Sequence, residues 1–229
     1  MRCMCDSKIT EVELRPGVWL NSGPAVYLTA LRALVVADVH WGYAASQRAA
    51  GRLLPAWGDG DIEARLDSLL AHYRPETVIV VGDMVHAADG RPAADAGLRR
   101  LGTRARVVAL AGNHDRARSD TLAASFAAAG YFFHHGHAPL VVPSECLEII
   151  GHHHPAASWS DGAGTRLKHP ALVEGTRRLI LPAFSPWAAG VSWNHRLEPG
   201  ERLWLVSPRR IFPLLDAKPL ASTRRPRGT

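Results

Sequence analysis

The sequence predicts an α/β fold, on three observations. Short apolar runs alternate with segments of helical periodicity, and acidic, amide or histidine residues follow directly after several of these runs. Functional groups of open α/β sheets lie beyond the carboxyl ends of the strands, which is where these polar residues fall. The chain has 229 residues, 47% of them hydrophobic, enough for one substantial core. We expect one domain over residues 1–216, then a basic, flexible tail containing proline over residues 217–229.

Periodicity predicts the elements in chain order. Ala33–Ala37 and Thr77–Val81 are short runs of branched apolar residues, which are typical of buried strands. Between them, apolar residues recur at helical spacing from Asp61 to Tyr73, and Pro75 ends this helix. Later apolar runs predict five further strands: Arg106–Leu110, the residues leading into His135, Leu147–Ile150, Arg178–Phe184 and Leu203–Val206. The last two of these strands have no candidate ligand at their ends and are expected to complete a second sheet.

A second helix is predicted in the alanine-rich segment from Thr121 to Gly130. Leu122 and Phe126 are four residues apart, as on one helix face. Gly130 suits a C-terminal cap, because glycine adopts the left-handed conformation at no steric cost.

Composition limits the class of protein. The 27 Lys and Arg residues against 21 Asp and Glu residues give a net charge of +6, which suits a polyanionic substrate but also serves solubility alone. No apolar stretch is long enough to span a membrane, and charges occupy the region where a signal peptide needs an apolar core, so we expect a cytoplasmic protein. The cysteines are odd in number and lack zinc-knuckle spacing, so neither disulfides nor structural zinc is expected: Cys3, Cys5 and Cys146.

Candidate metal ligands follow the predicted strands in a fixed order. They read Asp38-Val39-His40, Gly82-Asp83, Gly112-Asn113-His114-Asp115, His135-Gly136 and Gly151-His152-His153-His154. Any one of these motifs is commonly a turn or a cap, but the ordered set favours a metal centre. Hydrolysis of a phosphate ester must stabilise an attacking and a leaving oxygen, and two cations about 4 Å apart do both.

The spacing within the motifs predicts how each side chain points. Asp38 and His40, two residues apart on a segment expected to be extended, would face the same side and chelate one ion. His152 and His154 repeat that spacing, so His153 would turn away. Asp83, at the neighbouring strand end, is the expected bridge between the ions.

The types of ligand limit the metal. Asn113 offers a neutral oxygen, and the preceding glycine lets the backbone come close to the metal. His135 and His137 share one strand face, so either could be a ligand, and Gly136 favours His135. Histidine nitrogen combined with Asp and Asn oxygen suits Mn, Fe, Zn or Ni, and we expect two divalent ions, Mn²⁺ in the first place.

The ordered motifs resemble the calcineurin-like metallophosphoesterases from Ala37 to about Pro155. The resemblance implies a four-layer α/β/β/α sandwich with a dinuclear site. It implies His114 acting on the phosphoryl or leaving group, Asp115 steadying its surroundings, and a hydroxide between the metals as nucleophile. By matching position, it also assigns the ligands: Asp38, His40 and His154 to one ion, Asn113, His135 and His152 to the other, and Asp83 to both.

Four segments resemble more narrowly the ligase-associated DNA damage response endonucleases, the PdeM subgroup. They are residues Ala37–Gly42, Gly82–His86, Gly151–Pro155 and Leu181–Pro186. This resemblance implies a phosphodiesterase or endonuclease acting on DNA in repair, with a DNA-repair ligase or helicase as partner. Candidate substrate contacts are His86, Arg116 and Trp41. His86 stands where many relatives carry an acid, and it could contact substrate or support the ligands. Trp41 could stack on a base or have an ordinary lid or core role.

Two other functional classes stay open at this stage. The same chemistry could act on a small nucleotide or phosphomonoester. A non-catalytic interaction module on the same fold is the third class, against which the complete set of ligands argues. The oligomeric state is not predicted by the sequence.

Overall fold

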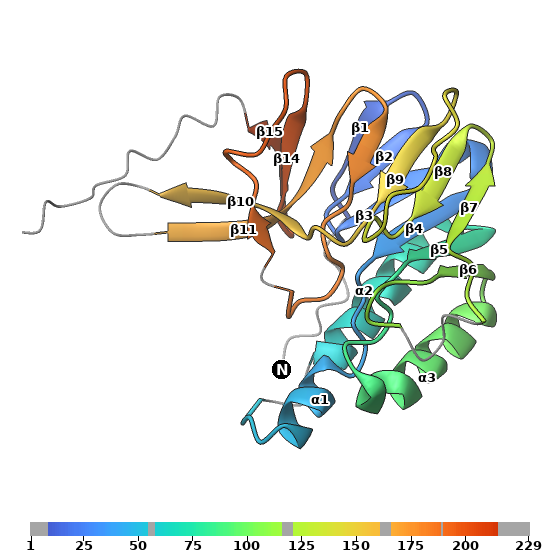
Figure 1. Cartoon of the computed structure of the whole chain (residues 1–229), viewed down its shortest axis with the longest axis vertical. Coiled ribbons are helices and arrows are strands. Elements are labelled where there is room, and N and C mark those ends of the chain that lie inside the picture. Colours follow the sequence, from blue (N-terminus) through green and yellow to red (C-terminus); the bar gives the residue numbers. More distant parts are fainter. Residues whose placement is uncertain (1–8, 55–57, 116–120, 161–165, 189, 215–229) are drawn as a thin grey trace, which may run out of the picture.

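The computed structural model describes residues 9–54, 58–115, 121–160, 166–188 and 190–214 (Figure 1). The tail predicted over residues 217–229, Arg116, Cys3 and Cys5 lie outside the described residues. No helix of the described part is long and apolar enough to cross a membrane.

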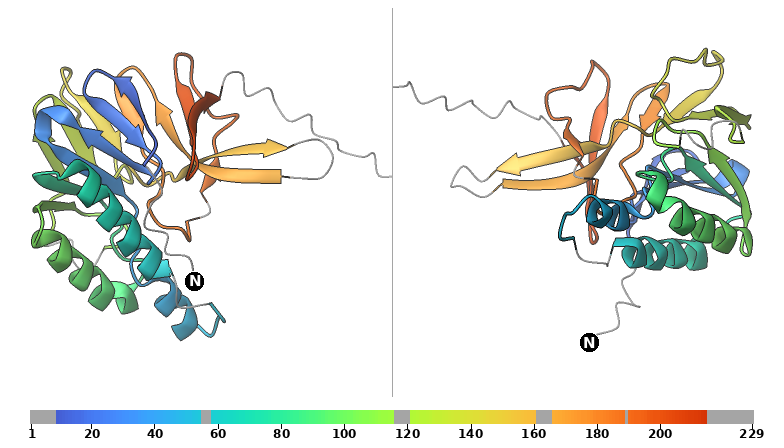
Figure 2. Two further views of the ribbon diagram at one scale, coloured as in Figure 1. Left: turned by 180° about the vertical axis from the view of Figure 1, so that it is seen from behind. Right: turned by 60° about the horizontal axis from the view of Figure 1, so that its bottom comes forward.

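Two stacked sheets form the centre of the molecule (Figures 1 and 2). The first sheet holds, in spatial order, β1 (Glu11–Arg15), β2 (Val18–Asn21), β3 (Ala25–Leu28), β4 (Ala33–Ala37), β5 (Thr77–Val81) and β6 (Arg106–Leu110). β1 to β4 are antiparallel, whereas β4, β5 and β6 run parallel, with Val35 beside Ile79 and Ile79 beside Val108. The predicted strands β4, β5 and β6 are confirmed, and β1 to β3 were not predicted.

The second sheet is built from the C-terminal half of the chain. Its strands are β7 (Ser125–Ala128), β8 (Tyr131–His134), β9 (Leu147–Ile150), β10 (Pro155–Ser160), β11 (Arg166–Glu174), β12 (Arg178–Ile180), β13 (Val191–Ser192), β14 (Arg202–Val206) and β15 (Ile211–Leu214). β8, β9 and β12 are parallel neighbours. β10 and β11 pair as an arm that projects beyond both sheets (Figure 1). The predicted second sheet with late strands is confirmed, although β12 ends at Ile180 rather than continuing to Phe184.

The helices are α1 (Tyr43–Ala49), α2 (Gly58–Tyr73) and α3 (Arg91–Gly102), with short 3₁₀ turns η1 (Thr29–Leu31) and η2 (Ala88–Gly90). Two of the helices, α2 and α3, lie on the outer face of the first sheet, and α1 packs beside α2 and η2 (Figure 2). α2 confirms the helix predicted from Asp61 to Tyr73. Its buried residues Ile62, Leu66 and Leu69 pack against the first sheet, as expected from their helical spacing.

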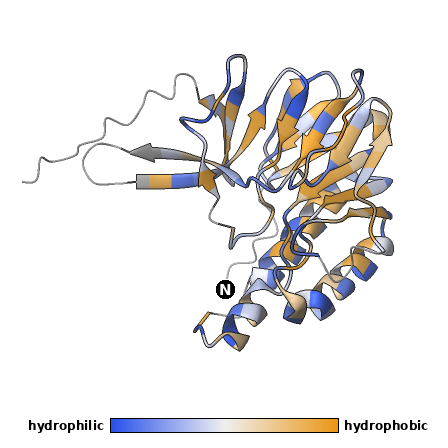
Figure 3. Cartoon of the chain, in the orientation of Figure 1, coloured by the Kyte–Doolittle hydropathy of each residue, from blue (hydrophilic) through white to orange (hydrophobic). Residues whose placement is uncertain are grey.

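Alternation along the central strands divides the core in two. On β4, Leu34 and Val36 face the helices, while Val35 and Ala37 face the second sheet, and all four are fully buried. Figure 3 shows that hydrophobic residues are concentrated on the strands of both sheets. The α/β fold with two sheets of the metallophosphoesterase type is therefore confirmed.

The outer face of the second sheet differs from the implied four-layer arrangement. In the described part of the chain no helix covers this face. Its buried residues, such as Val173 and Leu205, pack instead with Trp193, Leu197 and Leu214 from a loop and from β15. Short, irregular segments thus provide the fourth layer here.

The helix predicted between Thr121 and Gly130 is wrong, because this segment contains β7. Phe126 lies opposite Phe133 of β8, and their rings stack with centroids 5.9 Å apart. The two strands are joined by Ala129 and Gly130, both at positive φ, which is the geometry of a tight hairpin turn. Burial and pairing in the sheet override the helix propensity of the alanines.

Candidate metal centre

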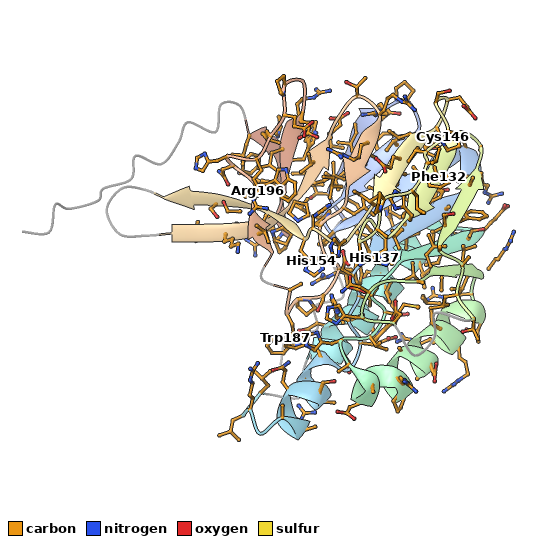
Figure 4. The ribbon with its side chains drawn as sticks, in the orientation of Figure 1. Phe132, His137, Cys146, His154, Trp187 and Arg196 are labelled. Carbon is orange, nitrogen blue, oxygen red and sulfur yellow. The ribbon has the colours of Figure 1, made fainter. Side chains whose placement is uncertain are left out.

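The predicted ligands gather at one edge of the sandwich, where the parallel strands of both sheets end. Asp38 follows β4, Asp83 follows β5 and Asn113 follows β6 in the first sheet, and His135 follows β8 in the second. His152 and His154 follow β9. In Figure 4, the labelled His137 and His154 lie at this edge, between the second sheet and the helices.

One group of side chains forms a cage that could hold a cation. A donor atom from each of Asp38, His40, Asp83 and His154 lies within 4.8 Å of the others. Asp38 and Asp83 are 0% and 2% exposed, so solvent water does not solvate the charge of either carboxylate. Two buried carboxylates this close require positive charge between or beside them.

Asp83 also faces a second group of ligands. His135 Nε2 lies 3.3 Å from Asp83 Oδ2 and 3.1 Å from Asn113 Oδ1. The ring of His152 lies 5.0 Å from that of His135. On its other side, Asp83 Oδ2 lies 4.0 Å from His40 Nε2. The Asp83 carboxylate therefore stands between two sets of nitrogen and oxygen donors.

Two buried nitrogens are placed where they could bind a cation. Among the described residues, His40 Nδ1 and His154 Nε2 have no hydrogen-bond partner. His154 Nε2 lies 3.2 Å from Asp38 Oδ1, but not in hydrogen-bonding geometry. Buried polar atoms are normally satisfied, and a metal ion shared by these groups would satisfy them.

The backbone at the ligands is left-handed rather than extended, which corrects the prediction from spacing. Asp38 and His40 have φ values of 54° and 49°, and His152 and His154 have 65° and 43°. Each left-handed non-glycine residue costs about 1–3 kcal/mol. The ligand pairs therefore converge through bends in the chain and not through strand alternation.

Hydrogen bonds from the backbone hold these bends. His40 N donates to the carbonyl oxygen of Asp83 at 2.9 Å, which ties the ends of β4 and β5 together. His152 N donates to Asp38 Oδ2 at 3.0 Å, so the carboxylate of one candidate ligand fixes the backbone of another. Such bonds to buried carboxylates are the strong, charge-assisted kind.

Three motif glycines make room for ligand side chains. A Cβ atom on Gly112 would lie 2.1 Å from Asp83 Oδ1, and one on Gly151 would lie 2.7 Å from Asp38 Oδ2. A Cβ on Gly82 would meet His135 Nδ1 at 2.2 Å, and the φ of Gly82 is +70°. Gly112 was expected to let the backbone approach a metal, but the space at all three glycines is filled by the candidate ligands themselves.

His114 borders the cage from the solvent side. Its backbone N donates to Asp83 Oδ1 at 2.9 Å, and its Nδ1 lies 2.8 Å from the carbonyl oxygen of His86. Since a carbonyl only accepts, Nδ1 carries the proton. The other nitrogen, Nε2, is 4.0 Å from Asp83 Oδ2 and belongs to a side chain that is 37% exposed. His114 can therefore meet a substrate at the open side of the cage.

Asp115 braces the loops that carry the ligands. Its carboxylate is buried and accepts hydrogen bonds from the backbone N–H groups of Met84, Val85 and Gly112, at 3.0–3.2 Å. Burial raises the pKa of Asp115 even though these three donors act against the rise. The side chain fixes the loop after β5 to the loop after β6.

The two histidines that the sequence left as alternatives differ in their surroundings. His135 is 1% exposed and lies beside Asp83 and Asn113. His137 is exposed, and its ring lies 5.2 Å from the ring of His135. His153, which was expected to turn away, packs its ring against Trp193 at 5.6 Å. The geometry favours His135 as the ligand.

The three candidate substrate contacts, Trp41, His86 and Arg116, differ in their burial and position. Trp41 is 1% exposed and donates from Nε1 to Glu63 at 2.9 Å, so the prediction that it contacts substrate is wrong. It is part of the core between the first sheet and α3, because its ring fills the space above Gly97. His86 is half-buried and lies 3.3 Å from Gln47 Nε2. Arg116 lies outside the described residues.

The protonation states of His40 and Asp83 suit metal binding. Burial lowers the pKa of His40 to about 4, although Asp38 and Asp83 act to raise it, so the ring is neutral at neutral pH. Burial acts to raise the pKa of Asp83, but the hydrogen bond and charge of His135, with the backbone N–H of His114 and the charge of His40, lower it to about 2. Burial acts to lower the pKa of His135, but its bonds to Asp83 and Val81 and the charges of Asp38 and Asp83 together raise it, so a metal bound by His135 must displace a proton.

Arg65 and Gln47 are residues near the centre that the sequence did not single out. Arg65 Nη1 donates to the carbonyl oxygen of Phe184 at 2.7 Å, in the segment that lies against Asp38. Arg65 lies on the polar side of a predicted helix, and nothing in the sequence indicated that it would contact Phe184. The segment Leu181–Pro186 had been noted, but only for its resemblance to a subgroup.

Comparisons with known proteins agree with this geometry. A family model described as calcineurin-like phosphoesterase matches residues 31–198. The chain is similar to the crystal structure of the nuclease MPE from Pseudomonas putida, with 30% sequence identity and a TM-score of 0.69. That similarity covers 90% of this chain and 100% of the other. No curated protein matches the chain.

Proposed function

The chain belongs to the calcineurin-like phosphoesterase family and is a metal-dependent phosphoesterase, and on that premise we propose that it is a phosphodiesterase that cleaves DNA through two metal ions. The observation that carries this proposal is the place of Asp83 between two sets of donors, with His40 on one side and His135 on the other. A carboxylate in that position can bridge two cations.

The residues at the strand ends would hold the metals. We assign Asp38, His40 and His154 to one ion, Asn113, His135 and His152 to the other, and Asp83 to both. The cations, when bound, supply Lewis acidity that offsets the charge of the phosphoryl group and activates water. Mn²⁺ is the ion we propose, because the donor set mixes imidazole nitrogen with carboxylate and amide oxygen.

His114 and Asp115 would complete the site in different ways. The carbonyl of His86 holds Nδ1 of His114, which leaves Nε2 facing the open side of the cage. From there Nε2 can hydrogen-bond the transferred phosphoryl or protonate the leaving oxygen. Asp115 acts on the backbone that presents Asp83 and Asn113 and has no contact with the reacting atoms.

DNA is the proposed substrate for two reasons. The solved structure that shares 30% identity is a nuclease, and the net charge of +6 favours a polyanion. The motif resemblance further supports a role in DNA repair in the cytoplasm, beside a DNA-repair ligase or helicase. A basic protein binds DNA backbone through counterion release, so its affinity for DNA should fall with salt.

Metal-stripped full-length protein, with and without added Mn²⁺, tests the proposal. The substrates are single-stranded, linear duplex and circular DNA, beside the chromogenic diester bis(p-nitrophenyl) phosphate. We expect Mn²⁺-dependent cleavage of DNA and of the diester. Asp83→Asn should abolish both activities and lower the bound metal measured by elemental analysis, whereas Asp89→Asn, at an exposed acid, should leave them unchanged.

The other outcomes separate the competing functions. Turnover of the diester without cleavage of any DNA would contradict the DNA assignment and favour a small nucleotide or phosphomonoester. Bound metal without turnover of any substrate would favour a non-catalytic module. Absence of bound metal in protein equilibrated with Mn²⁺ would refute the metal centre itself.

A further inference from the structure

A cavity of about 790 Å³ opens beside the candidate metal centre, and we call it the His154 groove. His154 lines this cavity and is also a member of the cage formed with Asp38, His40 and Asp83. The groove runs between α2 and β11, at the base of the projecting arm. In Figure 4, His154 lies below the junction of that arm with the body. The volume is in the range of ligand sites, about 300–1,000 Å³.

Much of the groove wall is apolar. Apolar residues from six separate parts of the chain contribute to it, among them Pro24, Ala64, Ala156, Pro170, Pro186 and Val206. Ala64 is exposed on α2, and Pro186 is exposed on the segment that follows β12. Apolar walls of this kind suit the faces of bases and sugars better than they suit a free inorganic anion.

Charged groups in the groove favour an anionic occupant. The guanidinium of Arg65 is fixed on the carbonyl of Phe184, and Asp61 lies near enough to raise the pKa of Arg65 against the lowering by burial. Lys168 on β11 is exposed, and its ammonium donates to the carbonyl of Gly190 at 2.5 Å. An ammonium has three donors, so others remain for a ligand. His169 lies next to it on the same wall.

We propose that the His154 groove binds the nucleotides on one side of the scissile phosphodiester bond. The apolar walls contact bases and sugars, and Lys168 contacts a phosphate of the same strand. This inference rests on the proposed cleavage of DNA and names where the substrate strand leaves the metal centre. The occupant is a nucleic-acid strand for two reasons. His154 belongs both to the groove and to the metal centre, and the ammonium of Lys168 has N–H groups left to donate to a phosphate.

The groove predicts a dependence on substrate length. The diester bis(p-nitrophenyl) phosphate has no neighbouring nucleotides, so it fills the metal centre alone. A dinucleotide reaches only the start of the groove, and an oligonucleotide of about 12 nucleotides is long enough to occupy it. The ratio of kcat/KM between oligonucleotide and diester therefore measures the contribution of the groove.

Ala64→Trp tests the groove, because Ala64 is exposed and the larger side chain would fill the groove without disturbing the core. Its matched control is Ala71→Trp, on the same helix and on nearly the same face, at an exposed site outside the groove. Ala64→Trp should raise KM for the oligonucleotide about tenfold or more and leave turnover of the diester unchanged. Ala71→Trp should change neither.

Lys168→Gln tests the cation separately. Loss of one phosphate contact should weaken oligonucleotide binding roughly threefold at moderate salt and reduce the slope of log K against log salt by about one. Lys168→Arg should restore both values. Arg106→Gln, at an exposed cation at the start of β6 and outside the groove, is the control.

The outcomes distinguish this inference from the function on which it rests. If the wild type turns over the diester but no DNA, the proposed function fails. If it cleaves DNA and Ala64→Trp behaves as Ala71→Trp does, the groove assignment is overturned. A change in sedimentation of Ala64→Trp with unaltered DNA kinetics would overturn it too, and would identify the groove as a contact between copies of the chain.

Discussion

Arg65 on α2 donates a hydrogen bond to the carbonyl oxygen of Phe184 at 2.7 Å, and its guanidinium carbon lies 5.1 Å from the centre of the Phe184 ring. The backbone around Phe184 is in turn bonded to the end of β4. Phe184 N donates to the carbonyl of Ala37 at 2.8 Å, and Ser185 N donates to that of Asp38 at 3.2 Å. Arg65 therefore supports the segment against which a candidate ligand rests.

Arg65→Met should loosen this segment. The change keeps much of the apolar stem but leaves the Phe184 carbonyl without its side-chain donor, so we expect unfolding free energy to fall by about 1–3 kcal/mol. The affinity for Mn²⁺ should fall as well, because Asp38 loses support. Urea denaturation of metal-free protein and calorimetric titration with Mn²⁺ measure the two effects. Arg99→Met, at an exposed arginine of α3, is the control, and equal behaviour of the two variants would contradict the assignment.

Gly112→Ala should damage the centre and strain the loop that carries Asp83. The added methyl would lie 2.1 Å from Asp83 Oδ1 and 2.2 Å from the backbone nitrogen of Asp83, so the carboxylate and the backbone that presents it must move. A shift of about 1 Å in a catalytic site costs about a hundredfold in rate, and we expect a loss of that size in kcat/KM for the diester. At Gly102 an added methyl meets no atom within 4 Å, so Gly102→Ala should retain full activity. A fully active Gly112→Ala protein would show that Asp83 is not positioned as described.

Asp115→Asn should destabilise the loops after β5 and β6. The carboxylate accepts three backbone N–H bonds, and an amide nitrogen in place of one oxygen would face donors. We expect a loss of about 1–3 kcal/mol in unfolding free energy. Amide hydrogen exchange at Met84 and Val85 should become faster. The exposed Asp89→Asn is the control, and unchanged exchange rates at both sites would contradict the bracing role.

The ion pair of Glu148 with His134 predicts a pH-dependent stability. His134 Nε2 lies 2.8 Å from Glu148 Oε1, and this hydrogen bond lowers the pKa of Glu148. A folded pKa below the unfolded value contributes stability that is complete above the unfolded pKa and is lost as pH falls through the folded one. The stability gap between wild type and Glu148→Gln should therefore shrink as the pH falls below about 4, where Glu148 becomes protonated. Urea denaturation at several pH values measures it, and a gap independent of pH would exclude this origin.

The sequence predicts the parallel strands and the ligand candidates, for separate reasons. β4 and β5 are buried on both faces, so their runs of branched residues are unbroken, and the partly buried edge strand β6 continues the same apolar pattern. Site residues such as Asp83 stand directly after those runs, at the edge of the sheet where parallel strands place their ends. Neither signal depends on contacts with distant parts of the chain.

Other features depend on long-range contacts and could not be predicted in the same way. The segment Thr121–Gly130 has the composition of a helix, yet pairing of Phe126 with Phe133 makes it a strand. β1 alternates charged and apolar residues, which is the pattern of a half-buried strand, but at five residues this pattern is too short to predict its pairing with β2. The left-handed backbone at Asp38 and His40 is held by bonds to Asp83 and to the segment after β12, which spacing within a motif does not reveal.

The short distance from His135 to Asp83 joins two layers of the molecule. His135 extends from β8 of one sheet, and Asp83 follows β5 of the other, so a cation bound by both would cross-link the halves of the sandwich. Ligand binding confined to the folded arrangement adds to its stability. Metal binding and the packing of one sheet on the other are consequently linked. A substitution that weakens the interface between the sheets should therefore lower the affinity of the protein for the metal ions.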